Sequence, residues 1–259
     1  MTTIDVLWTG GLDSTFLVAS LCAHEDIAVQ PYYIIDEARR STEQELKAIR
    51  TITDALRRHP ATRGELCDVR IFHKADIAPD KEVMAAWQRE RERVHLGKQY
   101  AFIARFARQQ QLNLAVGILF CDRGAISHSM GDGGLAEQQL GSISFLHVPA
   151  DAGNDAATLF GRLLFPTFMR GMEKPQEWQS LHDMGYGEVA AMTWFCHRPV
   201  CGLPVRALLT LPRCTERGYG LPCTRARTHP RHLTHIVRHN QSIYLFEKEF
   251  VLTDGPHFE

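Results

Sequence analysis

The chain has 259 residues, of which 44% are hydrophobic and 23% are charged, and its formal net charge is −1. This composition is typical of a folded globular protein, and it gives no overall electrostatic reason to expect nucleic acid or an anionic membrane as the partner. The sequence lacks both an apolar run of transmembrane length and the pattern of a signal peptide, and its seven cysteines are an odd number. We therefore expect a cytoplasmic protein with reduced thiols or a metal site rather than a disulfide framework, and no membrane partner.

Strands and helices are predicted to alternate through the first half of the chain. The pattern of apolar residues predicts, in order, a strand at Ile4–Trp8, a helix at Ser14–Ala23, a strand at Ile27–Ile35, a helix from Ser41 to Arg58, a strand at Cys67–Phe72, helices at Asp80–Arg93 and Gly97–Gln110, and a strand at Leu112–Leu119. This alternation implies right-handed βαβ units. We expect an α/β fold with an open, mainly parallel, twisted sheet and helices on both faces, of the Rossmann-like kind.

The second half is less regular. Residues Cys121–Asn154 contain a glycine-rich run and are predicted to form a long loop with one short helix. A helix is predicted at Lys174–Gly185, with Pro175 in its first turn. We expect two units, an α/β domain over residues 1–195 and a cysteine-containing extension over residues 196–259.

The turn after the first strand, TGGLDST, has the composition of a phosphate-binding loop. Gly10 and Gly11 allow close approach of a ligand to the backbone, and the N–H groups at the start of the following helix attract an anion. Hydroxyls come from Thr9, Ser14 and Thr15, while Asp13 supplies a carboxylate that can hold Mg²⁺. The alternative is a plain turn in which Ser14 caps the helix.

The same stretch, WTGGLDST, resembles the S-G-G-x-D-S loop of the PP-loop ATP pyrophosphatase superfamily, and Thr9 keeps the hydroxyl of the first serine. The resemblance implies an adenine nucleotide alpha hydrolase-like fold, with ATP and Mg²⁺ as cofactors. In this superfamily the loop holds the β and γ phosphates while a substrate oxygen attacks the α phosphate. The residues that would bind the nucleotide here are Thr9, Gly10, Gly11, Leu12, Asp13, Ser14 and Thr15.

Two further segments are similar to 7-cyano-7-deazaguanine synthase, a ligase of queuosine biosynthesis in this superfamily. The first is GKQYAFIARFA followed by LAVGI and Asp122, and it implies that Lys98, Gln99 and Asp122 contact substrate or nucleotide. The second is LFPTFMRGMEKPQEWQSLHDMGYGEVAAMTWFCHRPVCG. The resemblance implies adenylation of an acid like 7-carboxy-7-deazaguanine, followed by displacement of AMP by ammonia.

The zinc motif of that family, C-G-x-C-x-x-C, is incomplete here. Leu203, Pro204, Val205 and Arg206 follow Cys201 and Gly202, so the closely spaced cysteine pair is missing. Structural zinc needs four ligands. Cys214 and Cys223, or His197, would complete a site with Cys196 and Cys201 if the intervening loop folds back. The alternative is that Cys196 and Cys201 bind no metal.

Two other groups of polar residues have candidate roles. Asp36, Arg39 and Arg40 follow the second strand, at the sheet edge where ligands of open parallel sheets bind, and Arg39 or Arg40 would clamp a phosphate or carboxylate. The alternative is a solvated arginine pair before a helix. We expect Asp13, Lys98 and Arg39 to take part in catalysis. The segment Arg225–His239 is rich in arginine and histidine, which allows contact with RNA phosphates or an acidic partner but is also typical of a solvated surface.

Three functions are compatible with these patterns. The first is the ligase described above, and the second is a PP-loop enzyme that modifies tRNA or transfers a group to a protein acceptor. The third is a module that binds ATP or AMP without turnover. A homodimer is a further expectation.

Overall fold

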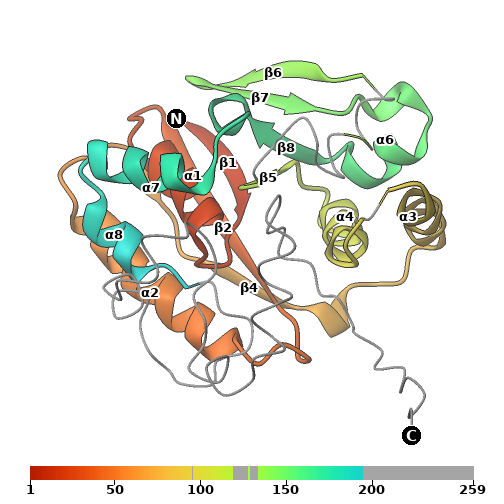
Figure 1. The fold of residues 1–259 in the computed structure, drawn as a ribbon, viewed down its shortest axis with the longest axis horizontal. Helices are drawn as coiled ribbons and strands as arrows, with labels where there is room; N and C mark the ends of the chain where they lie inside the picture. The colour runs from red at the N-terminus through yellow and green to blue at the C-terminus, as the bar shows by residue number, and fades with distance from the viewer. Residues whose placement is uncertain (95, 119–127, 129–133, 195–259) are drawn as a thin grey trace, which may run out of the picture.

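The computed structural model describes residues 1–94, 96–118, 128 and 134–194, which are coloured in Figure 1. Its strands are β1 (Thr2–Leu7), β2 (Ile27–Ile35), β3 (Glu65–Leu66), β4 (Arg70–His73), β5 (Leu114–Val116), β6 (Ala136–Leu140), β7 (Ile143–His147) and β8 (Leu163–Pro166). Its α-helices are α1 (Leu12–Cys22), α2 (Thr42–Arg58), α3 (Lys81–Arg93), α4 (Gln99–Gln109), α6 (Asp155–Phe160), α7 (Lys174–Asp183) and α8 (Gly187–Met192). Short 3₁₀ helices are η1 (Lys74–Asp76), η2 (Ala150–Ala152) and η3 (Thr167–Met169).

The strands form one open, eight-stranded sheet in the order β3-β2-β1-β5-β8-β7-β6, with β4 also paired to β2. The pairs that involve β1, β2, β3, β4 and β5 are all parallel, and β8 is parallel to β5. Within the described chain the antiparallel pairs are β6–β7 and β7–β8, so β7 is the strand that runs against its neighbours on both sides. This arrangement confirms the predicted Rossmann-like α/β fold with a mainly parallel sheet.

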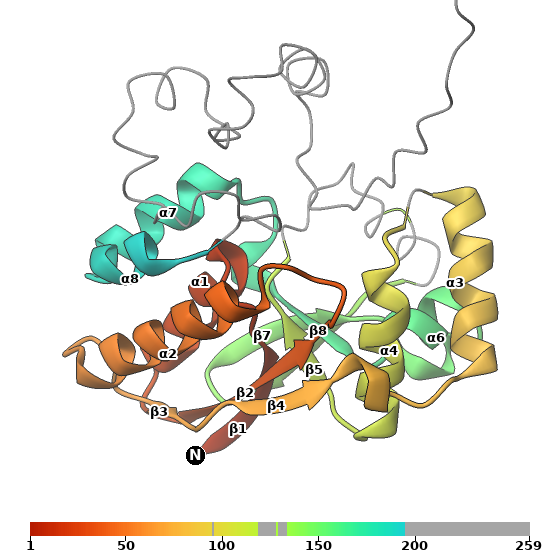
Figure 2. The ribbon, with the colours of Figure 1, turned by 90° about the horizontal axis from the view of Figure 1, so that it is seen from below.

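Helices cover both faces of the sheet, as Figure 2 shows with α1, α2, α7 and α8 on one side and α3, α4 and α6 on the other. Each face has its own buried cluster. One contains Val6, Trp8 and Ile52, and the other contains Tyr32, Phe106 and Phe160. Eight of the nine residues of β2 are buried, as expected for a strand covered on both faces.

Several predicted boundaries are confirmed, and two are corrected. Strand β2 and helices α2, α3, α4 and α7 lie where the sequence predicts them. The predicted strand Cys67–Phe72 is two short strands, because β3 and β4 pair with different parts of β2 and residues 67–69 between them belong to neither strand.

The prediction of a long loop over Cys121–Asn154 is also partly wrong. Its second half contains the β6–β7 hairpin, which is at the top of Figure 1. Strand β6 has the sequence AEQQL and lies at the edge of the sheet with no fully buried residue, so it lacks the apolar alternation by which strands are recognised. The start of this segment, including Asp122, lies outside the described residues.

No helix in the described ranges is both long and apolar enough to cross a membrane. The predicted extension over residues 196–259 also lies outside those ranges, so the predicted boundary at residue 195 stays a prediction.

Candidate functional site

The loop between β1 and α1 lies at the carboxyl edge of the parallel strands and is packed against α2. Gly10 has φ +72°, a conformation that side chains rarely adopt. A Cβ at Gly10 would lie 3.1 Å from the carbonyl oxygen of Glu45, 3.2 Å from Cγ1 of Ile49 and 3.3 Å from Cβ of Ala48. Glycine is therefore required here by both the backbone and the close approach of α2.

Backbone hydrogen bonds hold the loop in place on both sides of Gly11. The Thr15 amide donates to the Gly11 carbonyl at 2.9 Å, which is the first helical bond, and the Trp194 amide donates to the Gly10 carbonyl at 2.8 Å. The amides of Leu12, Asp13 and Ser14 precede that first bond and have no acceptor within the helix. Their N–H groups and the helix dipole favour an anion at this position.

The hydroxyls of the loop divide into two groups. Thr9 Oγ1 and Ser14 Oγ lie 3.2 Å apart, and Ser14 Oγ also accepts from the Thr9 amide at 3.3 Å. Thr15 is fully buried, and its Oγ1 accepts from the indole N–H of Trp8 at 3.0 Å. The side chain of Thr15 thus anchors the loop to the core. The N-cap of α1 is Gly11 and has no side-chain cap, so Ser14 is not the helix cap.

Asp13 lies beside two ionisable residues from the start of α7. The ammonium of Lys174 donates a hydrogen bond to Asp13 Oδ1. Glu177 is fully buried, and its carboxyl group shares a hydrogen bond with the carboxyl group of Asp13, since no N–H or hydroxyl group of the described residues donates to it. Burial first, then the negative charge of Asp13 and the hydrogen bond with its carboxyl group, raise the pKa of Glu177 to about 9, while Lys174 acts in the opposite direction. Two carboxyl groups and one ammonium therefore meet at the candidate phosphate loop.

Lys174 and Glu177 were not among the residues predicted for the site. They fall within the late segment that resembles the ligase family, but their distance from the loop in sequence gives no reason to pair them with Asp13. One signal was present in α7. Glu177 and Leu181 are both buried and are one turn apart, and a carboxylate on the apolar side of a helix is unusual.

Arg39 and Asp36 lie at the carboxyl end of β2, as predicted, and each has an ion-pair partner. Arg39 Nη1 is 3.4 Å from Oε1 of the buried Glu45, which also accepts from the hydroxyl of Ser41 at 2.6 Å. The backbone carbonyl of Glu45 packs against Gly10 of the loop. The ion pair with the Glu45 side chain therefore holds Arg39 close to the loop. The structure leaves its predicted role as a phosphate clamp untested.

Asp36 accepts a hydrogen bond from Lys74 Nζ at 2.7 Å. Burial acts to raise the pKa of Asp36, but the hydrogen bonds from Lys74 and from the Ala38 amide outweigh it, so the pKa is lowered. Lys74 Nζ also lies 4.9 Å from the ring centre of Phe102 on α4, in cation–π contact. Lys74 is thus a further charged residue at this edge that the sequence analysis did not select.

Lys98 and Gln99 begin helix α4, where Lys98 is the N-cap. Because α4 leads back to the start of β5, its first residues lie at the same edge of the sheet as the loop. Gly117, just after β5, packs directly on the loop, since a Cβ there would lie 2.5 Å from the Asp13 carbonyl oxygen. Helix α4 and the end of β5 therefore both approach the loop side of the sheet.

The predicted zinc ligands Cys196, Cys201, Cys214 and Cys223 lie outside the described residues, as does His197. Within the described part, no group of three or more histidine, cysteine, aspartate or glutamate side chains is arranged to hold a metal ion. The described cysteines, Cys22 and Cys67, are free thiols. The zinc prediction therefore remains a prediction.

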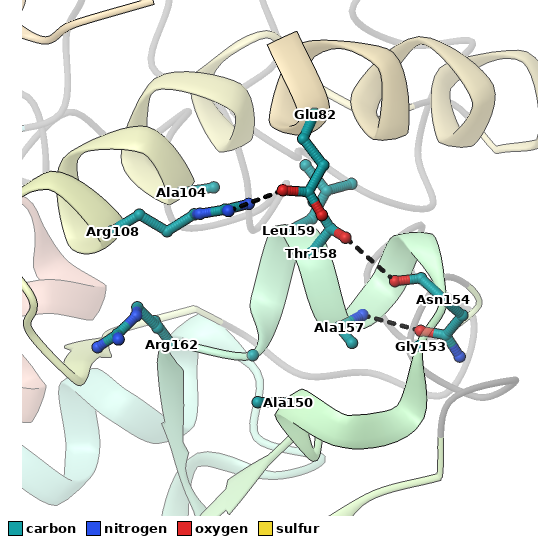
Figure 3. Close-up of a pocket in the computed structure, with 11 residues that line it drawn as sticks. Glu82, Ala104, Arg108, Ala150, Gly153, Asn154, Ala157, Thr158, Leu159 and Arg162 are labelled. Carbon is teal, nitrogen blue, oxygen red and sulfur yellow. Dashed lines mark hydrogen bonds and ion pairs between the residues drawn. The ribbon is translucent and has the colours of Figure 1, made fainter. Parts of the chain in front are cut away.

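A cavity of about 370 Å³ lies at the opposite edge of the sheet, between α3, α4 and α6 (Figure 3). It adjoins Arg162, whose carbonyl accepts from the Leu114 amide at the start of β5. Arg108, which lines it, is paired with Glu82 at 2.8 Å, as Figure 3 shows, and with Asp80 at 3.4 Å. This cavity is therefore separate from the loop, and the positive charge of Arg108 is already balanced.

Comparison with protein-family models finds no match, and comparison with curated proteins finds none either. Among solved structures, the chain is similar to the U34-tRNA thiolase NcsA from Methanococcus maripaludis, a structure that includes its 4Fe-4S cluster. The two are 12% identical, the TM-score is 0.42, and the alignment covers 90% of this chain and 73% of that one. A similarity of this size indicates neither a shared ligand nor a shared reaction.

Proposed function

We propose that this protein is an ATP-dependent enzyme of the PP-loop type, which transfers the adenylyl group of ATP to a substrate oxygen and releases pyrophosphate. The observation that carries the proposal is the β1–α1 loop. The loop brings together its glycine at φ +72°, the helix-start amides of Leu12, Asp13 and Ser14, and the paired hydroxyls of Thr9 and Ser14 at the carboxyl edge of the sheet. Ligands of open α/β folds bind at this edge.

The residues of the loop would act by binding and by electrostatics. Amide N–H groups and hydroxyls would hold the β and γ phosphates, and Lys174 would add a positive charge next to them. Holding pyrophosphate in a fixed position directs the acceptor oxygen to the α phosphate, so most of the rate enhancement would come from positioning and charge stabilisation.

Asp13 fits the prediction that it holds Mg²⁺. Its carboxylate already accepts from one cationic group, the Lys174 ammonium, so a cation is stabilised at this position. Mg²⁺ is commonly bound through one or two carboxylates together with substrate phosphates. When bound, the ion would neutralise charge on the transferred phosphates.

For the acceptor, we propose a small carboxylic acid similar to 7-carboxy-7-deazaguanine, with ammonia as the nucleophile that displaces AMP. The support is the sequence resemblance of the segments around Lys98 and Lys174. In this scheme a carboxylate oxygen attacks the α phosphate and pyrophosphate leaves. Ammonia then forms the C–N bond, and AMP leaves with the oxygen that it received.

The test is an assay of nucleotide products with ATP, Mg²⁺ and ammonium, with and without 7-carboxy-7-deazaguanine. Release of AMP and pyrophosphate that increases with the acid supports the ligase. If the protein binds ATP and releases products at a rate that the acid does not increase, another acceptor is indicated. If it binds ATP but releases no products, a nucleotide-binding module is favoured. Production of ADP and phosphate would overturn the proposed reaction.

A tRNA-modifying enzyme is the second candidate, and the basic segment Arg225–His239 favours it. This segment lies outside the described residues, so its support comes from the sequence alone. Binding of tRNA that weakens steeply with salt, together with AMP release that depends on tRNA, would support this candidate over the small acid.

A further inference from the structure

Glu45 is a charged residue on the buried face of α2, and its side chain is only 4% exposed. The other side chains that this helix buries are uncharged, namely those of Ala48, Ile49, Ile52, Thr53 and Leu56. Burying a carboxylate is costly unless it is paired and hydrogen-bonded, and apolar residues of similar volume often stabilise a fold equally well. The packing of α2 on the sheet therefore does not explain why a carboxylate lies here.

Three side chains donate hydrogen bonds to the Glu45 carboxylate. The hydroxyl of Tyr33 donates to Oε2 at 2.9 Å, the hydroxyl of Ser41 donates to Oε1 at 2.6 Å, and Nη1 of Arg39 lies 3.4 Å from Oε1. Burial first, and then the charge and the hydrogen bond of Glu45, raise the pKa of Tyr33, so its hydroxyl keeps the proton that it donates. The carboxylate is thus fixed in orientation, and Arg39 supplies a positive charge to it.

Arg39 is held by this carboxylate but keeps donors for another partner. Its side chain is 22% exposed, and within the described chain Nη1 is the guanidinium nitrogen that makes a hydrogen bond. The other N–H groups of a guanidinium match the oxygens of a phosphate. Glu45 also contacts the loop, because its backbone carbonyl oxygen is 3.1 Å from the position of a Cβ on Gly10. A cation with available donors is therefore held near the loop by one residue of α2.

We infer that Glu45 is a positioning residue, which holds the guanidinium of Arg39 where it binds the triphosphate of ATP on the β1–α1 loop. The inference rests on the proposed function, and it gives a role to a buried residue that neither the sequence patterns nor the comparisons select. It also distinguishes Arg39 from its neighbour Arg40, whose side chain is exposed. Arg39 contacts the phosphates, whereas Glu45 acts through Arg39.

A purely structural role for Glu45 would produce a different pattern of variants. If Glu45 only joined α2 to β2 through Tyr33, its replacement would lower the stability of the fold, and any effect on nucleotide binding would not depend on Arg39. If Glu45 acts through Arg39, the two replacements remove the same contact with the nucleotide. The second replacement then adds little to the first, and a double-mutant cycle separates the two cases.

The experiment measures binding of the non-hydrolysable analogue α,β-methylene-ATP, with Mg²⁺, to the full-length protein by isothermal titration calorimetry. The variants are Glu45→Gln, which keeps the shape of the side chain, Arg39→Ala, and the two combined. The control is Glu43→Gln, which removes an exposed acid from the first turn of the same helix. Arg40→Ala examines the neighbouring arginine. Urea unfolding measures the stability of each variant separately.

We expect the affinity for the analogue to fall about tenfold in Glu45→Gln and in Arg39→Ala, and to fall hardly further in the double variant. Glu43→Gln should bind as the wild type does. Unchanged affinity in Glu45→Gln would overturn the inference, and so would losses that multiply to about a hundredfold in the double variant. A loss in Arg40→Ala as large as that in Arg39→Ala would overturn it as well, because Arg40 is not the arginine that Glu45 holds.

Two further outcomes keep the test decisive. Should Glu45→Gln fail to fold, Tyr33→Phe replaces it, because loss of the hydroxyl loosens the carboxylate and should weaken binding about threefold in the wild type but not in Arg39→Ala. Unchanged affinity in Tyr33→Phe would then overturn the inference. Failure of the wild type to bind the analogue would contradict the proposed function together with the inference, whereas wild-type binding that Glu45→Gln retains in full contradicts the inference alone.

Discussion

The ammonium of Lys174 donates a hydrogen bond to Oδ1 of Asp13, and these two residues are 161 positions apart in the sequence. The bond joins the first turn of α7 to the first turn of α1. It places a cation, a carboxylate and the first amides of a helix at one edge of the sheet, which is where the proposed reaction needs them.

Replacement of Lys174 tests whether this pair serves function more than stability. In Lys174→Ala we expect pyrophosphate release to fall about 100-fold, because a cation beside the transferred phosphates is lost. The free energy of unfolding should change by less than about 1 kcal/mol, because partly exposed ion pairs contribute little. The measurements are steady-state kinetics and urea unfolding. Arg89→Ala, which removes the Arg89–Asp155 pair at the opposite side of the molecule, is the control and should retain full activity.

Gly10 and Gly153 provide a matched pair for the geometry of the loop. Both have positive φ, +72° and +65°, but a Cβ on Gly153 would meet only an oxygen 3.9 Å away. Each change to alanine should cost about 1–2 kcal/mol of stability from backbone strain. Gly10→Ala should cost about 1 kcal/mol more from overpacking against α2, and it alone should weaken ATP binding. Chemical unfolding and calorimetric titration with ATP measure the two effects, and equal ATP affinity in the two variants would contradict the assignment of the loop.

Thr15 is expected to serve the core rather than the nucleotide. Thr15→Val removes the acceptor of the buried Trp8 indole N–H and should lower the free energy of unfolding by about 1–3 kcal/mol. Thr15→Ser keeps the hydroxyl and should lose less. Thermal unfolding of the two variants is the measurement. Stability of Thr15→Val at or above that of Thr15→Ser would show that the hydrogen bond contributes nothing.

Glu177 should make the metal-free protein less stable as the pH rises. Its pKa is raised from the ordinary 4.5 to about 9, so the folded state keeps a proton that the unfolded state has lost throughout this interval. The stability that the folded protein gains by keeping this proton is fully present below about pH 4.5 and is lost progressively as the pH approaches 9.

Glu177→Gln removes this dependence and should stabilise the metal-free protein by about 2–3 kcal/mol at pH 7. Unfolding measured with a chelator at pH 5, 7 and 8.5 should show a gap between variant and wild type that widens with pH. A gap that stays constant across these conditions would contradict the raised pKa.

The layout of the fold could largely be predicted from the sequence, because β2 is a continuous apolar strand and helices α2 and α4 have strong apolar periodicity. The β6–β7 hairpin could not, because an edge strand such as AEQQL has no buried face to impose alternation. The division of residues 65–73 into two strands could not be predicted from the local sequence either. It depends on which residues of β2 each strand pairs with.

The candidate site was predictable only in its contiguous part. Residues Thr9–Ser14 form the loop that the glycines indicate, whereas Thr15 turns inward because nearly every position of α1 is buried. Lys174 and Glu177 reach Asp13 through the packing of α7 on α1, and a contact of that kind has no signature in either segment alone.

The most direct test of the central claim is the transfer of oxygen from acceptor to nucleotide. The protein is incubated with ATP, Mg²⁺, ammonium and 7-carboxy-7-deazaguanine labelled with ¹⁸O in its carboxylate, and the AMP formed is analysed by mass spectrometry. Adenylation predicts one ¹⁸O atom in each AMP, because the carboxylate oxygen that attacks the α phosphate leaves with it. AMP without the label, or ADP as the product, would contradict the account.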